Sequence, residues 1–128
     1  MHRECTDYWD GNWVDTAVEV SVGGFRGRYV AALRAEEFVG FRRQLEPLCE
    51  DLRGTASFVS MEEWLLIAVS GDGLGHFKAE CRARDEAGIG NCLTFPLAFD
   101  QTEVPSIILG LRAIEEAFPV LGTLEHET

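Results

Sequence analysis

The chain has 128 residues, of which 46% are hydrophobic and 10% aromatic. This composition suits one domain with a single core and excludes a disordered acidic tail. We expect one domain over residues 1–128, with an ordered core at about 13–119. Twenty-two Asp and Glu residues against 11 Lys and Arg give a formal net charge of −11. That charge disfavours nucleic-acid binding and favours a basic protein partner. The alternative is that the acidic charge only keeps the protein soluble.

Neither the opening residues nor the cysteines indicate export. The sequence MHRECTDYWDGNW has no apolar run, and the longest apolar runs elsewhere fall far short of the roughly 18 residues that a membrane span needs. Cys5, Cys49, Cys81 and Cys92 form no C-x-x-C pair, which favours reduced structural thiols. We therefore expect a cytoplasmic protein without a membrane interaction.

Two strands and a helix are predicted first. Residues 13–22 (WVDTAVEVSV) alternate between apolar and polar side chains, and Gly23 and Gly24 mark a turn into a second strand over 25–33. Beyond it, apolar residues recur at steps of three and four from Phe38 to Leu52, which predicts an amphipathic helix. Pro47 lies inside this helix, so a kink or break is expected near residues 44–46.

Strands over residues 55–60, 64–70 and 76–84 follow, the last two joined by the glycine-rich stretch GDGLG. This stretch does not resemble a phosphate-binding loop, because the sequence after it alternates like a strand. A two-residue turn at Asp72 and Gly73 would place Leu66 opposite Ala79. A three-residue loop at 71–73, with Gly73 left-handed, would place Leu65 opposite Ala79; we prefer this register because it aligns the stronger apolar faces.

The last predicted strand, residues 92–99, places Leu93, Phe95, Leu97 and Phe99 on one face, and Pro96 indicates an edge strand or a bulge. A helix follows, with Asp100 or Thr102 as its N-cap and Pro105 in its first turn. The element order is β-β-α-β-β-β-β-α. We predict an α+β fold with a mainly antiparallel sheet of about six strands and two helices.

The sequence contains no recognisable catalytic or metal-binding motif. His2, His76 and His126 are too scattered for a metal site, and a solvated strand histidine is the favoured interpretation of His76. Ser70, Ser106 and Asp72 form no nucleophile elbow. We therefore expect no enzymatic activity and no cofactor.

The outer face of the predicted sheet is the most informative surface. By alternation it collects tryptophan and apolar side chains with a charged rim, a composition typical of interaction surfaces. The alternative is that a helix covers each face, or that the sheet curls over itself, and buries both tryptophans. The acidic, aromatic stretch at Asp7, Tyr8, Trp9 and Asp10 would extend the patch or cover an edge. The candidate partner-binding residues are Trp13, Glu19, Arg28, Trp64, Leu66, Glu80 and Arg82.

Several segments together resemble small bacterial immunity proteins of the WapI type. They are the double strand containing VGGFRG, the helix ending in LRG, the GHF.A strand, the segment L.F.LAFDQT and the helix ending in AFP, from about Trp13 to Pro119. The most distinctive part joins residues 99–102 with Phe118 and Pro119. The resemblance implies a cytosolic protein that binds and neutralises the toxic domain of a cognate polymorphic toxin, often a nuclease. It transfers no functional residues.

Three hypotheses follow. The first is a protein-binding module of the immunity type, whose acidic surface engages a basic toxin domain. The second is a homo-oligomer, such as a homodimer, in which Trp13, Trp64 and Leu66 pack against a second copy. The third is a small-molecule pocket between the sheet and the helix kink at Pro47. Asp100, Gln101 and Thr102 are expected to form the entrance to the last helix rather than a binding site.

Overall fold

The computed structural model describes residues 12–86 and 89–121. Within these residues, six antiparallel strands and two helices follow in the predicted order, so the α+β class is confirmed. The strands divide into two sheets, a β1-β2 hairpin and a four-stranded sheet of order β3-β4-β5-β6. The elements are β1 (Trp13–Val22), β2 (Phe25–Arg34), α2 (Ala35–Asp51), β3 (Arg53–Val59), β4 (Leu65–Asp72), β5 (His76–Arg84), β6 (Cys92–Asp100) and α3 (Val104–Ala117).

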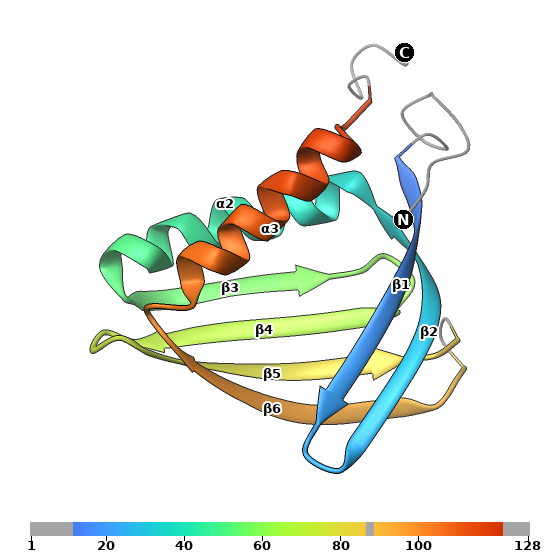
Figure 1. Ribbon diagram of the computed structural model, residues 1–128, viewed down its shortest axis with the longest axis horizontal. Coiled ribbons are helices and arrows are strands. Elements are labelled where there is room, and N and C mark those ends of the chain that lie inside the picture. Colours follow the sequence, from blue (N-terminus) through green and yellow to red (C-terminus); the bar gives the residue numbers. More distant parts are fainter. Residues whose placement is uncertain (1–11, 87–88, 122–128) are drawn as a thin grey trace.

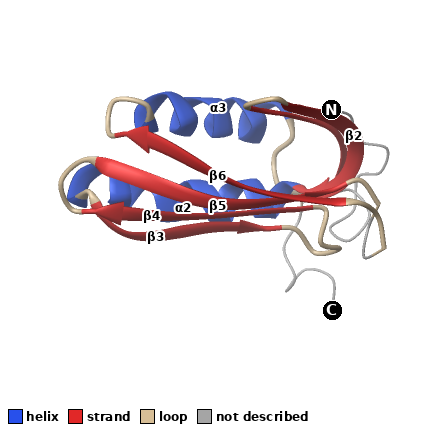
Figure 2. Cartoon of the chain, turned by 90° about the horizontal axis from the view of Figure 1, so that it is seen from below, coloured by secondary structure: helices blue, strands red, loops and turns tan. Residues whose placement is uncertain are grey.

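The hairpin crosses the four-stranded sheet at a steep angle instead of extending it (Figure 1). Figure 2 shows the hairpin and α3 on the same side of that sheet. Val20 and Ala31 of the hairpin belong to the same buried cluster as Phe58 and Phe77 of the sheet. The two sheets therefore bury side chains in one shared core. We call the face of the four-stranded sheet toward this core the inner face, and the opposite one the outer face.

The β4-β5 hairpin differs in register from the preferred prediction. Leu65 lies opposite Ala83, and Ala79 lies opposite Val69. The connecting loop is residues 73–75, where Gly73 and Gly75 have φ of 86° and 98°, so the loop has three residues but starts two positions later than expected. The partner of Leu65 moves from Ala79 to Ala83, an even number of residues, so each side chain stays on its predicted face and the same side chains reach the core. Pro96 does lie in an edge strand, as predicted, because β6 ends the sheet.

Helix α2 covers part of the inner face with its apolar stripe. Phe38, Phe41, Leu45 and Leu48 are buried, and the rings of Phe38 and Phe58 lie 5.3 Å apart. The helix continues through Pro47, so of the predicted kink or break the break does not occur. At the edge of the sheet, the Gln44 side chain accepts a hydrogen bond from the backbone N–H of Ser57 at 2.9 Å on β3. A side chain of α2 thus satisfies part of that strand edge.

Helix α3 lies beside α2 and starts differently from the prediction. Its N-cap residue is Glu103, without a side-chain cap, and Pro105 occupies the first turn as expected. Asp100 makes a separate turn ahead of the helix: its Oδ1 accepts from the backbone N–H of Thr102 at 2.9 Å, and its carbonyl accepts from that of Glu103 at 3.0 Å. Neither Asp100 nor Thr102 caps α3. In the described part of the chain, no helix combines the length and apolar character required to cross a membrane.

Candidate partner-binding surfaces

The predicted candidate residues do not form one continuous surface. Glu19 and Arg28 lie opposite each other on the hairpin face that points away from the core. Their side chains are 70% and 72% exposed, and Glu19 Oε1 lies 3.6 Å from Arg28 Nε. Leu66, Glu80 and Arg82 lie instead on the outer face of the four-stranded sheet, with Leu66 directly opposite Arg82. Because the core lies between the two faces, these groups are on opposite sides of the molecule.

The outer face of the four-stranded sheet is not acidic at its centre. Lys78, Glu80 and Arg82 alternate along β5 and are all exposed. Two cations therefore flank one carboxylate, next to the half-buried Leu66 and Ala68 of β4. A basic partner would meet net positive charge there. The excess of acidic residues that the composition shows must be found elsewhere.

Both candidate tryptophans are half-buried and contact other parts of the fold. The Trp13 ring lies under the guanidinium of buried Arg34, whose Cζ is 5.0 Å from the ring centroid. Trp64 stacks on Tyr29 with centroids 6.3 Å apart, and its carbonyl accepts a hydrogen bond from the Tyr29 hydroxyl at 2.7 Å. Burial raises the pKa of Tyr29, so this hydroxyl remains a donor. Trp64 thereby joins the hairpin to the start of β4. The predicted acidic stretch at 7–10 lies outside the described residues.

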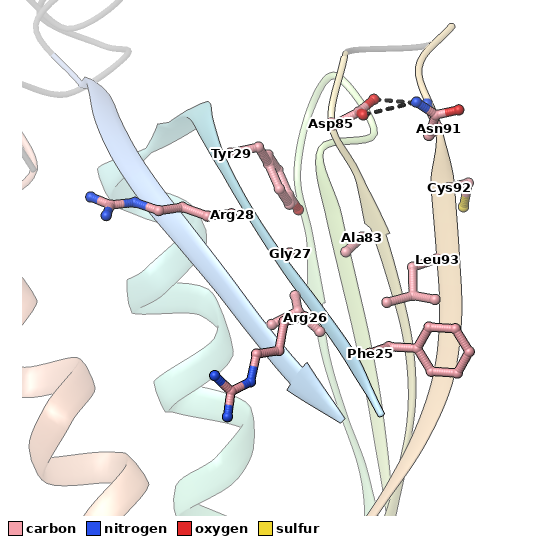
Figure 3. Close-up of a pocket in the computed structure, with 11 residues that line it drawn as sticks. Phe25, Arg26, Gly27, Arg28, Tyr29, Ala83, Asp85, Asn91, Cys92 and Leu93 are labelled. Atoms are coloured by element: carbon pink, nitrogen blue, oxygen red, sulfur yellow. Dashed lines mark hydrogen bonds between the residues drawn. The ribbon is translucent and has the colours of Figure 1, made fainter. Parts of the chain in front are cut away.

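A cleft of about 340 Å³ lies between β2 and the adjoining ends of β5 and β6. Figure 3 shows Tyr29 and Phe25 pointing toward Ala83 and Leu93, while Arg26 and Arg28 point away from the cleft. At its rim, Asp85 accepts two hydrogen bonds from Asn91: the backbone N–H to Oδ1 at 2.7 Å and Nδ2 to Oδ2 at 3.1 Å. Alternation along single strands gave no sign of this cleft, because it arises from the crossing of two sheets.

A second hollow, the inner groove, lies over the inner face of the sheet. Two adjoining cavities of about 330 and 260 Å³ share Ile67 and Leu97 in their walls. One extends toward α2 and α3, and the other toward β1. The charged residues lining the inner groove are Glu19 and Glu103, and Leu97 is 42% exposed. The small-molecule hypothesis placed a pocket at Pro47, whereas this hollow meets α2 at Phe41 and Leu45.

Two segments of the resemblance, GHF.A and DQT, meet at one end of the sheet. The backbone N–H of Gln101 donates to the carbonyl of Gly75 at 2.8 Å, and the rings of Phe77 and Phe99 stack 5.5 Å apart. A Cβ on Gly75 would lie 2.7 Å from Oε1 of Gln101. Gly75 and Gln101 therefore fit each other closely. The glycine loop and the DQT segment have a structural reason to occur together.

A carboxylate organises the glycine loop. Asp72 Oδ1 accepts hydrogen bonds from the backbone N–H groups of Leu74 at 2.7 Å and His76 at 3.2 Å. These bonds, chiefly the one from Leu74, lower the pKa of Asp72. The imidazole of His76 lies 3.2 Å from Asp72 and is 76% exposed, which agrees with a solvated strand histidine.

Residues 12–86 and 89–121 contain neither a metal-binding cluster nor a disulfide. They contain no group of three or more His, Cys, Asp or Glu placed to hold a metal ion. Cys49, Cys81 and Cys92 are free thiols there, whereas Cys5, His2 and His126 lie outside the described residues. Burial raises the pKa of the Cys81 thiol, which keeps it protonated and unreactive.

Comparison with known proteins identifies a family. No curated protein and no solved structure matches the chain. Residues 2–119 match the Immunity protein WapI-like family over nearly the whole length of the chain, including the segments at 75–79 and 99–102 that meet at the end of the sheet. The chain therefore belongs to the WapI-like immunity protein family.

Proposed function

We propose that this protein binds the toxic domain of a cognate polymorphic toxin in the cytoplasm and neutralises it by contact, without a catalytic step of its own. The observation that carries the proposal is membership of an immunity protein family over residues 2–119. An immunity protein implies a protein partner. Inhibition by binding needs a complementary surface and no reactive centre.

The net charge of −11 supports a basic partner. Oppositely charged surfaces accelerate encounter and disfavour wrong partners, and both effects weaken as salt is added. An immunity protein benefits from fast association, because the toxin acts until it is bound. We therefore propose that the toxin domain carries net positive charge on the surface that it presents.

Co-expression tests this function. The toxic domain of the polymorphic toxin encoded beside this protein is induced in bacteria with and without the immunity protein. Survival only in its presence, together with a 1:1 complex of the purified proteins, is the expected result. Continued killing with folded immunity protein present, and no complex at micromolar concentrations, would refute the proposal. An association rate that does not change with ionic strength would refute the basic-partner part alone.

A further inference from the structure

We propose that the inner groove receives an extended segment of the toxin domain, which adds to the edge of β1 at residues 18–22 and places apolar side chains against Ile67 and Leu97. This inference rests on the proposed function and specifies where the partner binds. It assigns the contact to the hollow between the hairpin, the helices and the sheet, and not to the outer sheet face.

The edge of β1 is available for pairing. Among the described residues, β1 pairs with β2 only. All five residues from 18 to 22 line the inner groove. Successive side chains of a strand point to opposite faces, so a hollow that meets all five residues meets the edge of the strand and its backbone groups. An unpaired edge beside an apolar hollow is the arrangement that strand addition uses.

The floor of the inner groove is apolar and accessible. Leu97 is 42% exposed although it points to the inner face, while Phe95, two residues earlier on the same strand, is 8% exposed. Ile67 and Ile107 are half-buried in the same hollow. A segment with alternating apolar side chains would bury this surface with one face and leave its other face toward solvent.

Charge selects this hollow over the other surfaces for a basic segment. Its charged lining residues are both acidic: Glu103, exposed just before α3, and Glu19 of β1, whose carboxylate lies on the outward face of the hairpin beside Arg28. The acidic residue that lines the cleft beside β2 is Asp85, whose carboxylate already accepts two hydrogen bonds from Asn91, and the outer face carries two cations around Glu80. A segment with basic residues flanking an apolar stretch is complementary to the inner groove and is repelled at the outer face.

A matched pair of lysine substitutions tests the site. The probe is the catalytically disabled toxic domain encoded beside this protein, and its Kd is measured by calorimetry. Leu97→Lys should weaken binding by about tenfold or more, because it places a cation in the apolar contact. Leu109→Lys, an identical change at a 67% exposed leucine of α3 outside the groove, should change Kd by less than about threefold. Equal effects of the two substitutions would overturn the proposal.

A second pair keeps the test valid if Leu97→Lys does not fold. Glu103→Lys, at the exposed rim of the inner groove, should weaken binding by about tenfold, and Glu50→Lys, an exposed control on α2, by less than about threefold. Amide hydrogen exchange of the complex should show protection at residues 18–22, and protection at β3 instead would overturn the proposal. If the wild-type protein binds the toxin domain and the groove substitutions do not weaken binding, only the proposed site is refuted. If no complex forms at all, the proposed function is refuted as well.

Discussion

Arg42 on α2 and Glu115 on α3 form a two-point ion pair, with Nη2 to Oε1 at 3.0 Å and Nε to Oε2 at 2.5 Å. The side chains are 14% and 21% exposed, and Glu46 accepts a further bond from Arg42 at 2.8 Å. The hydrogen bonds that Arg42 donates, first to Glu115 and then to Glu46, raise the pKa of Arg42 above its already high value. The pair joins α2 and α3, the two helices that supply Phe41, Leu45 and Ile107 to the wall of the inner groove.

A double-mutant cycle with Arg42→Ala and Glu115→Gln should give a coupling energy of about 1–2 kcal/mol in urea unfolding, because the pair is bidentate and shielded from solvent. The exposed Glu19–Arg28 pair is the control, and its coupling should stay below about 0.5 kcal/mol. Similar coupling energies for the two pairs would contradict this account of the helix contact.

Two glycine-to-alanine substitutions should change stability in opposite directions. A Cβ at Gly71 would lie 2.6 Å from the carbonyl oxygen of Leu52 and 2.8 Å from Cε1 of Phe77. Gly71→Ala should therefore destabilise the protein by about 2 kcal/mol or more. A Cβ at Gly40, inside α2, meets nothing within 4 Å, so Gly40→Ala should stabilise the protein by about 0.5–1 kcal/mol through helix propensity. Thermal unfolding of both variants measures the difference; a neutral Gly71→Ala would show that the Leu52 carbonyl and the Phe77 ring move aside at little cost.

The elements could be predicted from the sequence because each depends on local periodicity. Alternation located β1 and β5, and the three- and four-residue steps from Phe38 located α2. The β4-β5 register could not be fixed in this way. Three glycines permit a loop centred on Asp72 or on Leu74. The second is stabilised by the Asp72 carboxylate, which accepts hydrogen bonds from the backbone N–H groups of Leu74 and His76.

The candidate surface was harder to predict than the fold. Alternation tells which side chains share a face of a strand, but it does not tell which strands share a sheet. Glu19 and Glu80 were assigned to one outer face because a single sheet was assumed, and the crossing hairpin places them on opposite sides. The inner groove combines Val18, Ile67 and Ile107, which are far apart in the sequence. Only tertiary packing brings them together.

Asp72→Asn should make the protein less stable near neutral pH, with an effect that disappears in acid. The folded state lowers the pKa of Asp72 from its ordinary value of 3.8. A lowered pKa contributes stability that is present above the ordinary pKa and is lost as the pH falls through the folded one. The difference in Tm between wild type and Asp72→Asn should therefore shrink from about pH 6 to about pH 3. A difference that stays constant over this range would contradict the role of the carboxylate charge in the loop.

Asn12 connects the two ends of the described chain, and its removal should release the segment after α3. Its side chain is fully buried; Nδ2 donates to the carbonyl of Leu121 at 3.2 Å, and Oδ1 accepts from the backbone N–H of Leu121 at 2.8 Å. The Asn12 carbonyl also accepts from Ala35 N–H at 2.7 Å, at the start of α2. Asn12→Ala leaves both backbone groups of Leu121 without these partners, which should cost about 2 kcal/mol.

The matched control is Asn91→Ala, because Asn91 also makes a side-chain hydrogen bond but is exposed. Its cost in urea unfolding should stay below about 1 kcal/mol. Hydrogen exchange separates a local from a global effect: in Asn12→Ala the amide of Leu121 should exchange faster than in wild type, while the amides of the central strand β5 follow only the loss of global stability. Unchanged exchange at Leu121 would mean that contacts other than Asn12 hold this segment. The start of the hairpin, the start of α2 and the segment after α3 would then be held together independently of that one side chain.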